Sequence, residues 1–366
     1  MTFWYLLLAA AALIALSACV YVTRRIHRFT PIKRLGERHA LLSWLVSLCP
    51  LAAPALFYII NVYSAAIVLM HMALFLLISD GVCRVIEAAK KKKLRRDLAG
   101  VIALGLAAVY LAAGWYQAHH VWVTRYEFET DKSLGGDIRV VEVADSHLGI
   151  TLDGEDFARE MEKVRSAKPD VVVICGDFVD DDTEKEDMLT ACRALGQLDA
   201  PYGVYFIYGN HDKGYFRYRN FTSRELRDAL AENGVVILED ETADVDGRFL
   251  LIGRQDRSTP DRADMMALTE GLDPEKYHIV LDHHPNDYAA EAEADVDLVL
   301  SGHTHGGHIF PAGLIGLAMG SNDRVYGTEE RDGTRFVVTS GISGWAIPFK
   351  TGTFSEIVVI DIRERD

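Results

Sequence analysis

Long apolar stretches without charges dominate the first third of the chain. Residues 3–22 and 98–118 each hold about the ~20 apolar residues that a helix needs to cross a bilayer. The apolar stretch 41–79 is roughly twice as long as one crossing requires, at ~1.5 Å of rise per residue. It therefore predicts two spans, 41–60 and 62–79, that turn near Asn61. Together these stretches predict an all-α transmembrane region of about four helices over residues 1–118.

From Val121 onward, short apolar runs alternate with polar segments. Several runs are continuously apolar and rich in β-formers, as expected for strands that are buried on both faces. They cover residues 170–177, 203–210, 278–284 and 297–303. Residues 155–167 and 223–234 have helical periodicity instead, and strands that alternate with helices indicate an α/β sheet.

Two further patterns complete the predicted architecture of residues 119–366. The run 121–129 alternates like a half-exposed strand and is followed by the turn-forming stretch 133–136, so a hairpin with the strand at 137–145 is predicted. Later apolar runs have fewer helices between them and predict a second sheet, which gives a layered sandwich. These runs cover residues 249–253, 334–341 and 355–362.

Charge divides the chain at the same point as hydropathy. Residues 1–118 hold 13 of the 38 Lys and Arg residues and 4 of the 53 Asp and Glu residues, which leaves 25 basic and 49 acidic residues for 119–366. A strongly acidic region disfavours polyanionic partners, so no nucleic-acid partner is expected.

The basic residues of the first region also predict its orientation. Six Lys or Arg residues lie between the first and second predicted spans, and seven lie between the third and fourth. Because Lys and Arg stay on the cytoplasmic side, the N-terminus is expected outside. Four crossings then predict a multi-pass cell-membrane protein with residues 119–366 on the extracytoplasmic side.

Five cysteines occur in the chain, and no two of them form a CxxC pair. Neither a zinc ribbon nor a disulfide framework is therefore indicated. Cys175 lies in a predicted strand and Cys192 in the helix after it, so two buried thiols are expected, with a bridge between them as the alternative.

Five of the predicted strands end in residue types that bind metals. They are Asp145 and His147, Asp177, the group Asn210, His211 and Asp212, then His283 and His284, and finally His303 and His305. Sites in open α/β sheets form at the carboxyl ends of the strands, so folding is expected to gather these side chains. Imidazole with carboxylate and amide oxygen suits Mn²⁺, Fe or Zn²⁺, and the absence of thiolate argues against a closed structural zinc site.

Seven of these side chains are expected to be ligands, which is too many for one ion. The number therefore predicts two divalent ions bridged by an aspartate. The order Asp-x-His, Gly-Asp-x-x-Asp, Gly-Asn-His-Asp, His-x-Pro and Gly-His-x-His-Gly-Gly resembles the calcineurin-like metallophosphoesterases over residues 121–362. It is similar in particular to their membrane-anchored bacterial branch. The resemblance implies an α/β sandwich of two mixed β-sheets flanked by helices for residues 119–366.

The resemblance also implies roles for the residues at the strand ends. Asp145, His147 and His305 would hold the first metal, Asp177 would bridge, and Asn210, His283 and His303 would hold the second. Mn²⁺ is expected first, with Fe or Zn²⁺ as alternatives. A metal-bridging water or hydroxide would then attack phosphorus in line.

His211, which is not a ligand in this family, would stabilise the phosphoryl oxygens or protonate the leaving alkoxide, and Asp145 is expected to orient it. His284 and His308 are not expected to be ligands, and Asp180 is expected outside the ligand set. Near the C-terminus the family often has Pro-x-Arg-Phe where this chain reads Ile347-Pro348-Phe349-Lys350, which leaves a phosphate contact for Lys350 in doubt.

These features together predict a membrane-anchored phosphoesterase. A phosphodiester is preferred to a monoester because His211 can protonate an alkoxide, and the membrane tether favours a lipid-linked or envelope substrate. One alternative is a non-catalytic metal-binding scaffold or sensor domain on the membrane bundle, although such relatives commonly lack the histidine that is present here at His211. Another is a cytoplasmic-facing pyrophosphatase of lipid-A precursors, which would require the opposite orientation.

Overall fold

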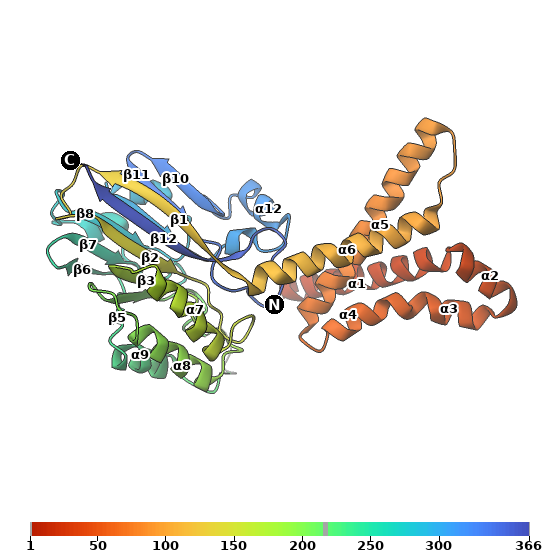
Figure 1. Ribbon diagram of the computed structural model, residues 1–366, viewed down its shortest axis with the longest axis horizontal. Helices are drawn as coiled ribbons and strands as arrows, with labels where there is room; N and C mark the ends of the chain where they lie inside the picture. Colours follow the sequence, from red (N-terminus) through yellow and green to blue (C-terminus); the bar gives the residue numbers. More distant parts are fainter. Residues whose placement is uncertain (1, 215–218, 366) are drawn as a thin grey trace. The chain divides into compact units, whose positions relative to one another are not determined.

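The computed structural model describes residues 2–214 and 219–365 and divides the chain into two compact units, Met1–Ala113 and Gly114–Asp366 (Figure 1). The first unit is helical. Its helices are α1 (Thr2–His27), α2 (Thr30–Arg38), α3 (Ala40–Leu48), the 3₁₀ turn η1 (Cys49–Leu51), α4 (Ala52–Phe57), α5 (Val62–Lys90) and α6 (Arg96–His119). The boundary falls within α6, whose residues from Gly114 onward belong to the second unit.

Local chemistry accounts for the ends of these helices. Helix α3 stops just before Pro50, which lies in η1, because proline has no N–H for an intrahelical hydrogen bond. Asn61 begins α5, since its side chain accepts a hydrogen bond of 2.8 Å from the N–H of Ser64.

Three helical segments among the described residues are long and apolar enough to cross a membrane, namely Ala40–Phe57, Val62–Lys90 and Arg96–His119. The predicted spans 41–60, 62–79 and 98–118 fall on these segments. The predicted span 3–22 falls in α1, where the side chains before residue 10 lie outside the described part.

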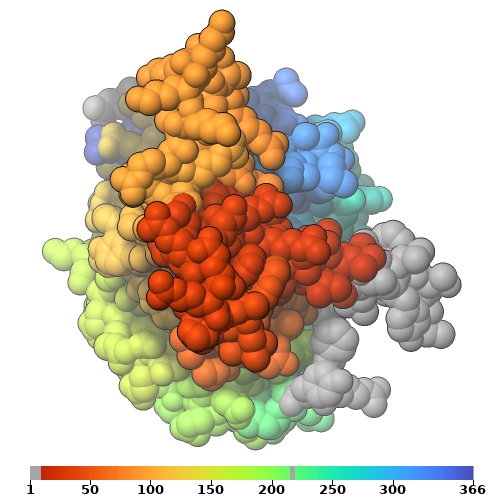
Figure 2. All heavy atoms as spheres, turned by 90° about the vertical axis from the view of Figure 1, so that its right-hand side faces the viewer, coloured from red at the N-terminus to blue at the C-terminus, as the bar shows by residue number. Residues whose placement is uncertain are grey.

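The surface of the helical unit is unusually apolar, and Figure 2 shows its described atoms in red and orange. Large apolar side chains such as Leu13, Leu45 and Val85 are more than half exposed. Water would oppose so much exposed apolar surface, whereas lipid accommodates it. The helical unit is therefore suited to a membrane.

The second unit contains two six-stranded mixed sheets, which confirms the predicted fold class. The first sheet has the order β1 (Val121–Thr130), β12 (Ser355–Glu364), β2 (Ile138–Val143), β3 (Val171–Cys175), β4 (Val204–Ile207), β5 (Val236–Ile237). The second has the order β10 (Gly327–Arg331), β11 (Thr334–Val338), β9 (Leu298–Ser301), β8 (Tyr277–Leu281), β7 (Phe249–Gly253), β6 (Glu241–Val245). The helices of this unit are α7 (Gly154–Ser166), α8 (Lys185–Gly196), α9 (Ser223–Glu232), α10 (Met265–Thr269), α11 (Tyr288–Glu293), the 3₁₀ turn η2 (His305–Gly307) and α12 (Ala312–Ala318).

Three apolar layers hold the sheets and helices together. Val173 and Ile279 belong to the layer that packs the two sheets against each other. Helices α7, α8 and α9 cover the outer face of the first sheet, where Phe157 of α7 packs with Ile174 of β3. Helices α10 and α11 pack against the outer face of the second sheet. Because strands such as β3 are covered on both faces, they are apolar throughout.

The predicted hairpin between β1 and β2 is wrong, because β12 lies between them. Val123 of β1 pairs with Ile357 in parallel, and Val141 of β2 pairs with Val359 of β12 in antiparallel fashion. The connection 131–137 is long enough to pass the end of one strand, and Glu364 of β12 accepts hydrogen bonds from its backbone. A C-terminal strand that pairs on both edges gives two hydrogen-bonded ladders in place of one.

All five cysteines are free, and Cys175 and Cys192 are both buried. The expectation of two buried thiols is thus confirmed.

Candidate metal centre

The residues predicted to bind metal follow strands of both sheets. Asp145 and His147 follow β2, Asp177 follows β3 and Asn210 follows β4 in the first sheet, whereas His283 follows β8 and His303 and His305 follow β9 in the second. The sequence analysis expected a single sheet to gather them. Strands β2, β3 and β4 are parallel, as are β8 and β9, and the carboxyl ends of the two sets meet at one edge of the sandwich.

The two sets of loops are joined by direct hydrogen bonds. The ring of His283, from the second sheet, lies 2.7 Å from the carbonyl oxygen of Cys175 in the first. In the other direction, the N–H of His303 donates to both carboxylate oxygens of Asp145 at 3.0 Å. These contacts hold the loops of the two sheets together at the place where the donor side chains converge.

The donor atoms lie close together. His147 Nε2 is 3.1 Å from His305 Nε2 and 3.5 Å from Asp177 Oδ2. His283 Nε2 lies 3.1 Å from the same Asp177 oxygen, and His305 Nε2 lies 3.8 Å from Asp145 Oδ1. Asp177 therefore stands between the two groups of histidines.

Asn210 and His303 complete the cluster, with Asn210 Oδ1 at 3.0 Å from His303 Nδ1. The structure thus brings together all seven predicted ligands. The trio Asp145, His147 and His305, and the trio Asp145, Asp177 and His283, each place their donor atoms within 4.8 Å of one another.

The backbone at this edge has an unusual conformation. Five of the seven residues have a positive φ, namely Asp145, His147, Asp177, His303 and His305, with values from 36° to 68°. Side chains other than glycine rarely adopt this region, and such residues concentrate at functional sites where the surrounding structure enforces them. Each of these turns directs a side chain into the centre instead of continuing its strand.

Close approach of the loops explains two of the glycines. A Cβ at Gly209 would collide with the carboxylate and the N–H of Asp177. A Cβ at Gly176, where φ is 80°, would lie 2.6 Å from the nitrogen of Gly209 and 2.7 Å from His283 Nδ1. Only glycine leaves room for the loops after β3 and β4 to approach the donor cluster.

Hydrogen-bond partners set the tautomers of three histidines. The Nδ1 atoms of His147, His283 and His305 lie 3.0 Å from Asp180 Oδ2, 2.7 Å from the Cys175 carbonyl and 3.3 Å from the Ser343 carbonyl, respectively. Each partner is an acceptor, so each Nδ1 carries the proton and each Nε2 presents a lone pair.

The facing lone pairs test whether this donor set suits a cation. His147 and His305 direct two lone pairs at each other, and the buried Nε2 of His283 has no aligned hydrogen bond although it lies beside Asp177. Donors arranged in this way repel one another unless positive charge lies among them. The arrangement therefore fits divalent cations.

Electrostatics favour the metal-binding forms of His303, His305 and Asp177. Burial lowers the pKa of His303 to about 2 and holds the pKa of His305 well below its usual value. Both rings are therefore neutral at neutral pH. Burial raises the pKa of Asp177, but the adjacent imidazoles of His283 and His147 outweigh this effect and hold the pKa well below the ordinary value.

The carboxylate that orients His211 is Asp180, which corrects the expectation that Asp145 would do so. His211 Nδ1 lies 2.9 Å from Asp180 Oδ1, and the other oxygen of Asp180 accepts a hydrogen bond from His147 Nδ1. Asp145 is instead engaged by the backbone N–H of His303. Asp180 was expected outside the ligand set, but its position between two histidines depends on folding that no local pattern reveals.

Asp212 has a role that the sequence analysis did not identify. Its buried carboxylate accepts hydrogen bonds from the N–H groups of Asp177, Phe178, Val179 and Gly209, at 2.7–3.0 Å. It thus joins the loop after β3 to the loop after β4. The only signal in the sequence is its place in Gly-Asn-His-Asp, where it could equally have been a ligand.

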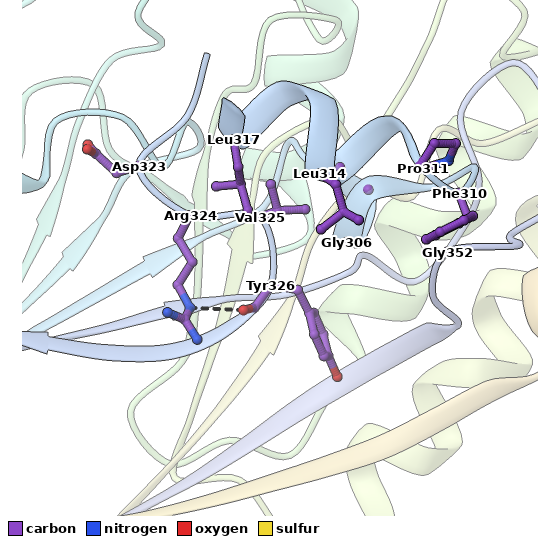
Figure 3. A pocket seen from close by; sticks show the side chains of 12 residues that line it. Gly306, Phe310, Pro311, Leu314, Leu317, Asp323, Arg324, Val325, Tyr326 and Gly352 are labelled. Carbon is purple, nitrogen blue, oxygen red and sulfur yellow. Dashed lines mark hydrogen bonds between the residues drawn. The ribbon is translucent and has the colours of Figure 1, made fainter. Parts of the chain in front are cut away.

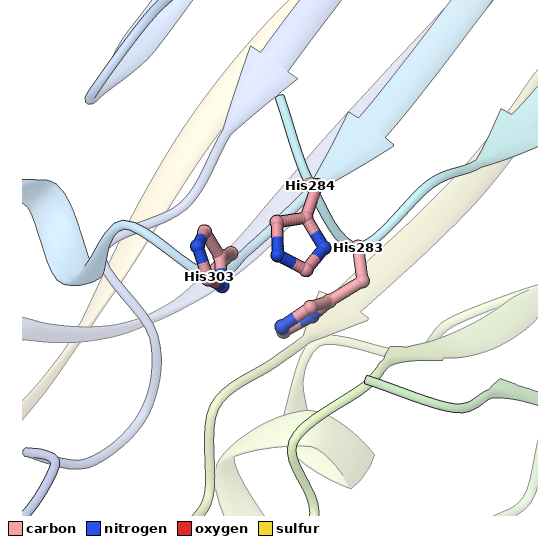
Figure 4. A group of neighbouring side chains, drawn as sticks. All are labelled: His283, His284 and His303. Atoms are coloured by element: carbon pink, nitrogen blue, oxygen red, sulfur yellow. The ribbon is translucent and has the colours of Figure 1, made fainter. Parts of the chain in front are cut away.

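His284 lies closer to the centre than the sequence analysis implied. Figure 4 shows it beside both His283 and His303, and its ring centroid is 3.7 Å from that of His303. These three histidines form a further group that could hold a cation. The Nδ1 of His284 lies 2.8 Å from Asp256 Oδ2, so Asp256 holds the ring beside the centre.

Lys350 does not reach a phosphate. Its side chain is fully buried, and its ammonium donates to the carbonyl oxygens of Ser340 and Gly341 at 2.6 and 3.0 Å. Gly341 lies against Asp145, since a Cβ added there would be 2.6 Å from the Asp145 Cβ. Lys350 therefore braces the loop behind the metal centre.

Comparison with known proteins places this geometry in context. The sequence profile described as calcineurin-like phosphoesterase matches residues 138–307. An uncharacterized metallophosphoesterase of Campylobacter jejuni is 32% identical over 63% of this chain and 60% of its own length. An uncharacterized metallophosphoesterase of Aquifex aeolicus is 30% identical over 70% of this chain and 98% of its own length. A Danio rerio protein described as a transmembrane protein with a metallophosphoesterase domain is 29% identical over 76% of this chain and 65% of its own length.

Replacing Asp212 with alanine should loosen the centre as a whole. The Asp212→Ala change leaves four buried N–H groups without their acceptor, which should lower the free energy of unfolding by about 3 kcal/mol or more. We expect the melting temperature of the full-length protein to fall by roughly 6–12 °C. Bound metal, measured by elemental analysis, should fall with it.

The control is Glu232→Ala, which removes an exposed carboxylate at the end of α9 and should change neither quantity. An Asp212→Ala protein with the wild-type melting temperature and full metal content would show that the loops after β3 and β4 do not depend on the Asp212 carboxylate.

Proposed function

Because the chain belongs to the calcineurin-like metallophosphoesterase family, we propose that residues 119–366 hydrolyse phosphate esters while the apolar helices anchor them in a membrane. The observation that carries this proposal is the buried cluster in which His147, His305 and His283 direct lone pairs toward each other and toward Asp177. Phosphodiesters are the preferred substrates in this proposal.

We assign the donors to two ions. Asp145, His147 and His305 would hold the first, Asn210, His283 and His303 would hold the second, and Asp177 would bridge them. The position of Asp177 between His147 and His283 supports the bridging role. The mixture of imidazole, carboxylate and amide oxygen favours Mn²⁺, with Fe or Zn²⁺ as alternatives.

When bound, two such cations neutralise charge on the phosphoryl oxygens and lower the pKa of a coordinated water. The protein then has to orient the ester and supply a proton to the leaving group. His211 is suited to the second task, since its Nδ1 is held by Asp180 and its ring lies 4.9 Å from that of the ligand His147. Burial opposes the protonation of His211, but the hydrogen bond that His211 donates to Asp180 and the charges of Asp177 and Asp180 raise its pKa above the usual value.

A proton donor beside the metals favours substrates with poor leaving groups. The second ester oxygen of a phosphodiester leaves as an alkoxide, which needs a proton in the transition state. The ring of Trp345 lies 5.6 Å from that of His211 and is 45% exposed, so it forms part of the entrance to this proton donor. This entrance is accessible from solvent.

We further propose that the catalytic unit faces the extracytoplasmic side. The basic residues lie between the first and second apolar segments and between the third and fourth, which assigns both connections to the cytoplasmic side. The chain after the fourth segment then lies on the opposite side of the membrane. An extracytoplasmic position and a membrane anchor together favour a lipid-linked or envelope phosphate ester.

The dinuclear assignment predicts metal content and its loss in one variant. Full-length protein loaded with Mn²⁺ should bind two ions per chain and hydrolyse bis(p-nitrophenyl) phosphate. Asp177→Asn should reduce kcat by roughly a thousandfold, because the shared negative ligand is lost. Asp295→Asn, at an exposed turn before β9, is the matched control and should behave as the wild type. Binding of one ion or fewer per chain would refute the assignment.

The proposed role of His211 predicts a dependence on the leaving group. His211→Ala should lower kcat by roughly a hundredfold for a diester with an alkyl leaving group, and far less for a p-nitrophenyl group, which leaves without a proton. A series of diesters with leaving groups of increasing pKa measures this difference. Equal losses across the series would remove His211 from proton transfer.

The proposed orientation predicts where the C-terminus lies. A reporter enzyme that is active only after export, fused after Asp366, should be active in intact cells. A second reporter that is active only in the cytoplasm should be silent at the same position. The reverse pattern would place the catalytic unit in the cytoplasm and favour a cytoplasmic lipid precursor as the substrate.

A further inference from the structure

A pocket of about 420 Å³ lies beside the loop that carries His303 and His305. Gly306 and Gly307, which directly follow His305, form one wall, and Leu314 and Leu317 of α12 form another (Figure 3). The volume lies within the ~300–1,000 Å³ range of small-molecule sites. The pocket therefore lies under an apolar helix, and two of its lining residues directly follow the ligand His305 in the chain.

The segment over this pocket is the most exposed apolar surface of its unit. Among the described residues of 119–366, ten large apolar side chains are exposed, and five of them lie between positions 310 and 319. They are Phe310, Leu314, Ile315, Leu317 and Met319, with exposed fractions of 42–76%. No charged residue occurs between His308 and Asp323. Clustered apolar exposure on a soluble face marks a binding surface.

Hydrogen bonds connect this segment to the end of α6. The carbonyl of Gly114, in the last turns of α6, accepts from the N–H of Lys350, and Trp115 of α6 packs edge-on against Phe349. The next residue, Thr351, donates its N–H to the His308 carbonyl and accepts from the N–H of Phe310. The apolar segment is thus connected to the end of α6 through Lys350 and Thr351.

The end of α6 is where a candidate membrane span finishes. Arg96–His119 is long and apolar enough to cross a bilayer, and Trp115 and Tyr116 near its end are both exposed. Tryptophan and tyrosine concentrate at the boundary between lipid and water. The contacts through Lys350 and Thr351 therefore link Phe310 to the last turns of this span.

We propose that residues 310–319 enter the lipid surface and that the pocket beneath them takes a hydrocarbon chain of a membrane lipid. The phosphate of that lipid would then lie at the metal centre, beyond Gly306. This inference rests on the proposed phosphoesterase function and narrows its substrates to phosphate esters of membrane lipids. Gly306 and Gly307 line the pocket and directly follow His305, so the same loop serves the chain-binding and phosphate-binding parts of this proposal.

Photocrosslinking in a bilayer tests the proposal directly. The full-length protein is placed in phosphatidylcholine nanodiscs that contain a small share of phosphatidic acid with a diazirine in its acyl chain. After irradiation and digestion, mass spectrometry should find adducts within residues 306–326 as well as in the membrane-spanning helices. Adducts confined to residues 1–119 would overturn the proposal.

A charged substitution tests the residues themselves. Leu314→Asp places a carboxylate on a side chain that is 61% exposed and lines the pocket, so the fold should tolerate it while labelling of residues 306–326 falls at least fivefold. Met266→Asp, on α10 and 54% exposed, is the matched control and should leave the labelling unchanged. Equal labelling of all three proteins would contradict the role of α12.

Hydrolysis of bis(p-nitrophenyl) phosphate by the wild type separates this proposal from the function on which it rests. Turnover without adducts in residues 306–326 would leave the phosphoesterase intact and refute the lipid site. Adducts without turnover of any ester would keep the lipid site and refute the enzyme.

Discussion

The structure of the catalytic unit depends on a set of buried donor atoms that repel one another. His147 and His305 bring two lone pairs to 3.1 Å, and the carboxylates of Asp145 and Asp177 lie beside them without solvent. In a medium of low polarity this arrangement costs free energy unless cations share it. The fold thus gives up stability at this edge in exchange for affinity for metal ions.

The rest of the unit supports that unfavourable cluster. Left-handed backbone at five donor residues is held in place by packed loops, and the buried side chains of Asp212 and Lys350 form hydrogen bonds with the backbone of those loops. Asp180 fixes two histidines at once, so that one ring presents a lone pair and the other can hold a proton. Rigid surroundings of this kind are what allow a site to be organised before its ligands arrive.

The loops at this edge of the sandwich also lead to the apolar helix α12 and contact the last turns of α6. The loop that provides His303 and His305 continues through two glycines into α12, whose apolar side chains face solvent. The N–H of Lys350, in the loop that its side chain braces, donates to the carbonyl of Gly114 in the last turns of α6. The donor cluster, the apolar segment and the last turns of α6 are therefore linked by a short series of contacts, on which the proposal of a lipid substrate rests.

The sequence by itself determined the apolar segments, the two-sheet class and the side chains drawn to the strand ends, because hydropathy, strand composition and residue type are local properties. Only the tertiary structure decided that β12 separates β1 from β2, that both sheets share the centre, and that Asp180 orients His211. Each of these depends on which distant segments come into contact, as Val141 and Val359 do, and such pairing depends on the packing of the whole unit. The pocket under α12 also depends on tertiary structure, since its lining combines residues 306–326 with Gly352, which is distant in the chain.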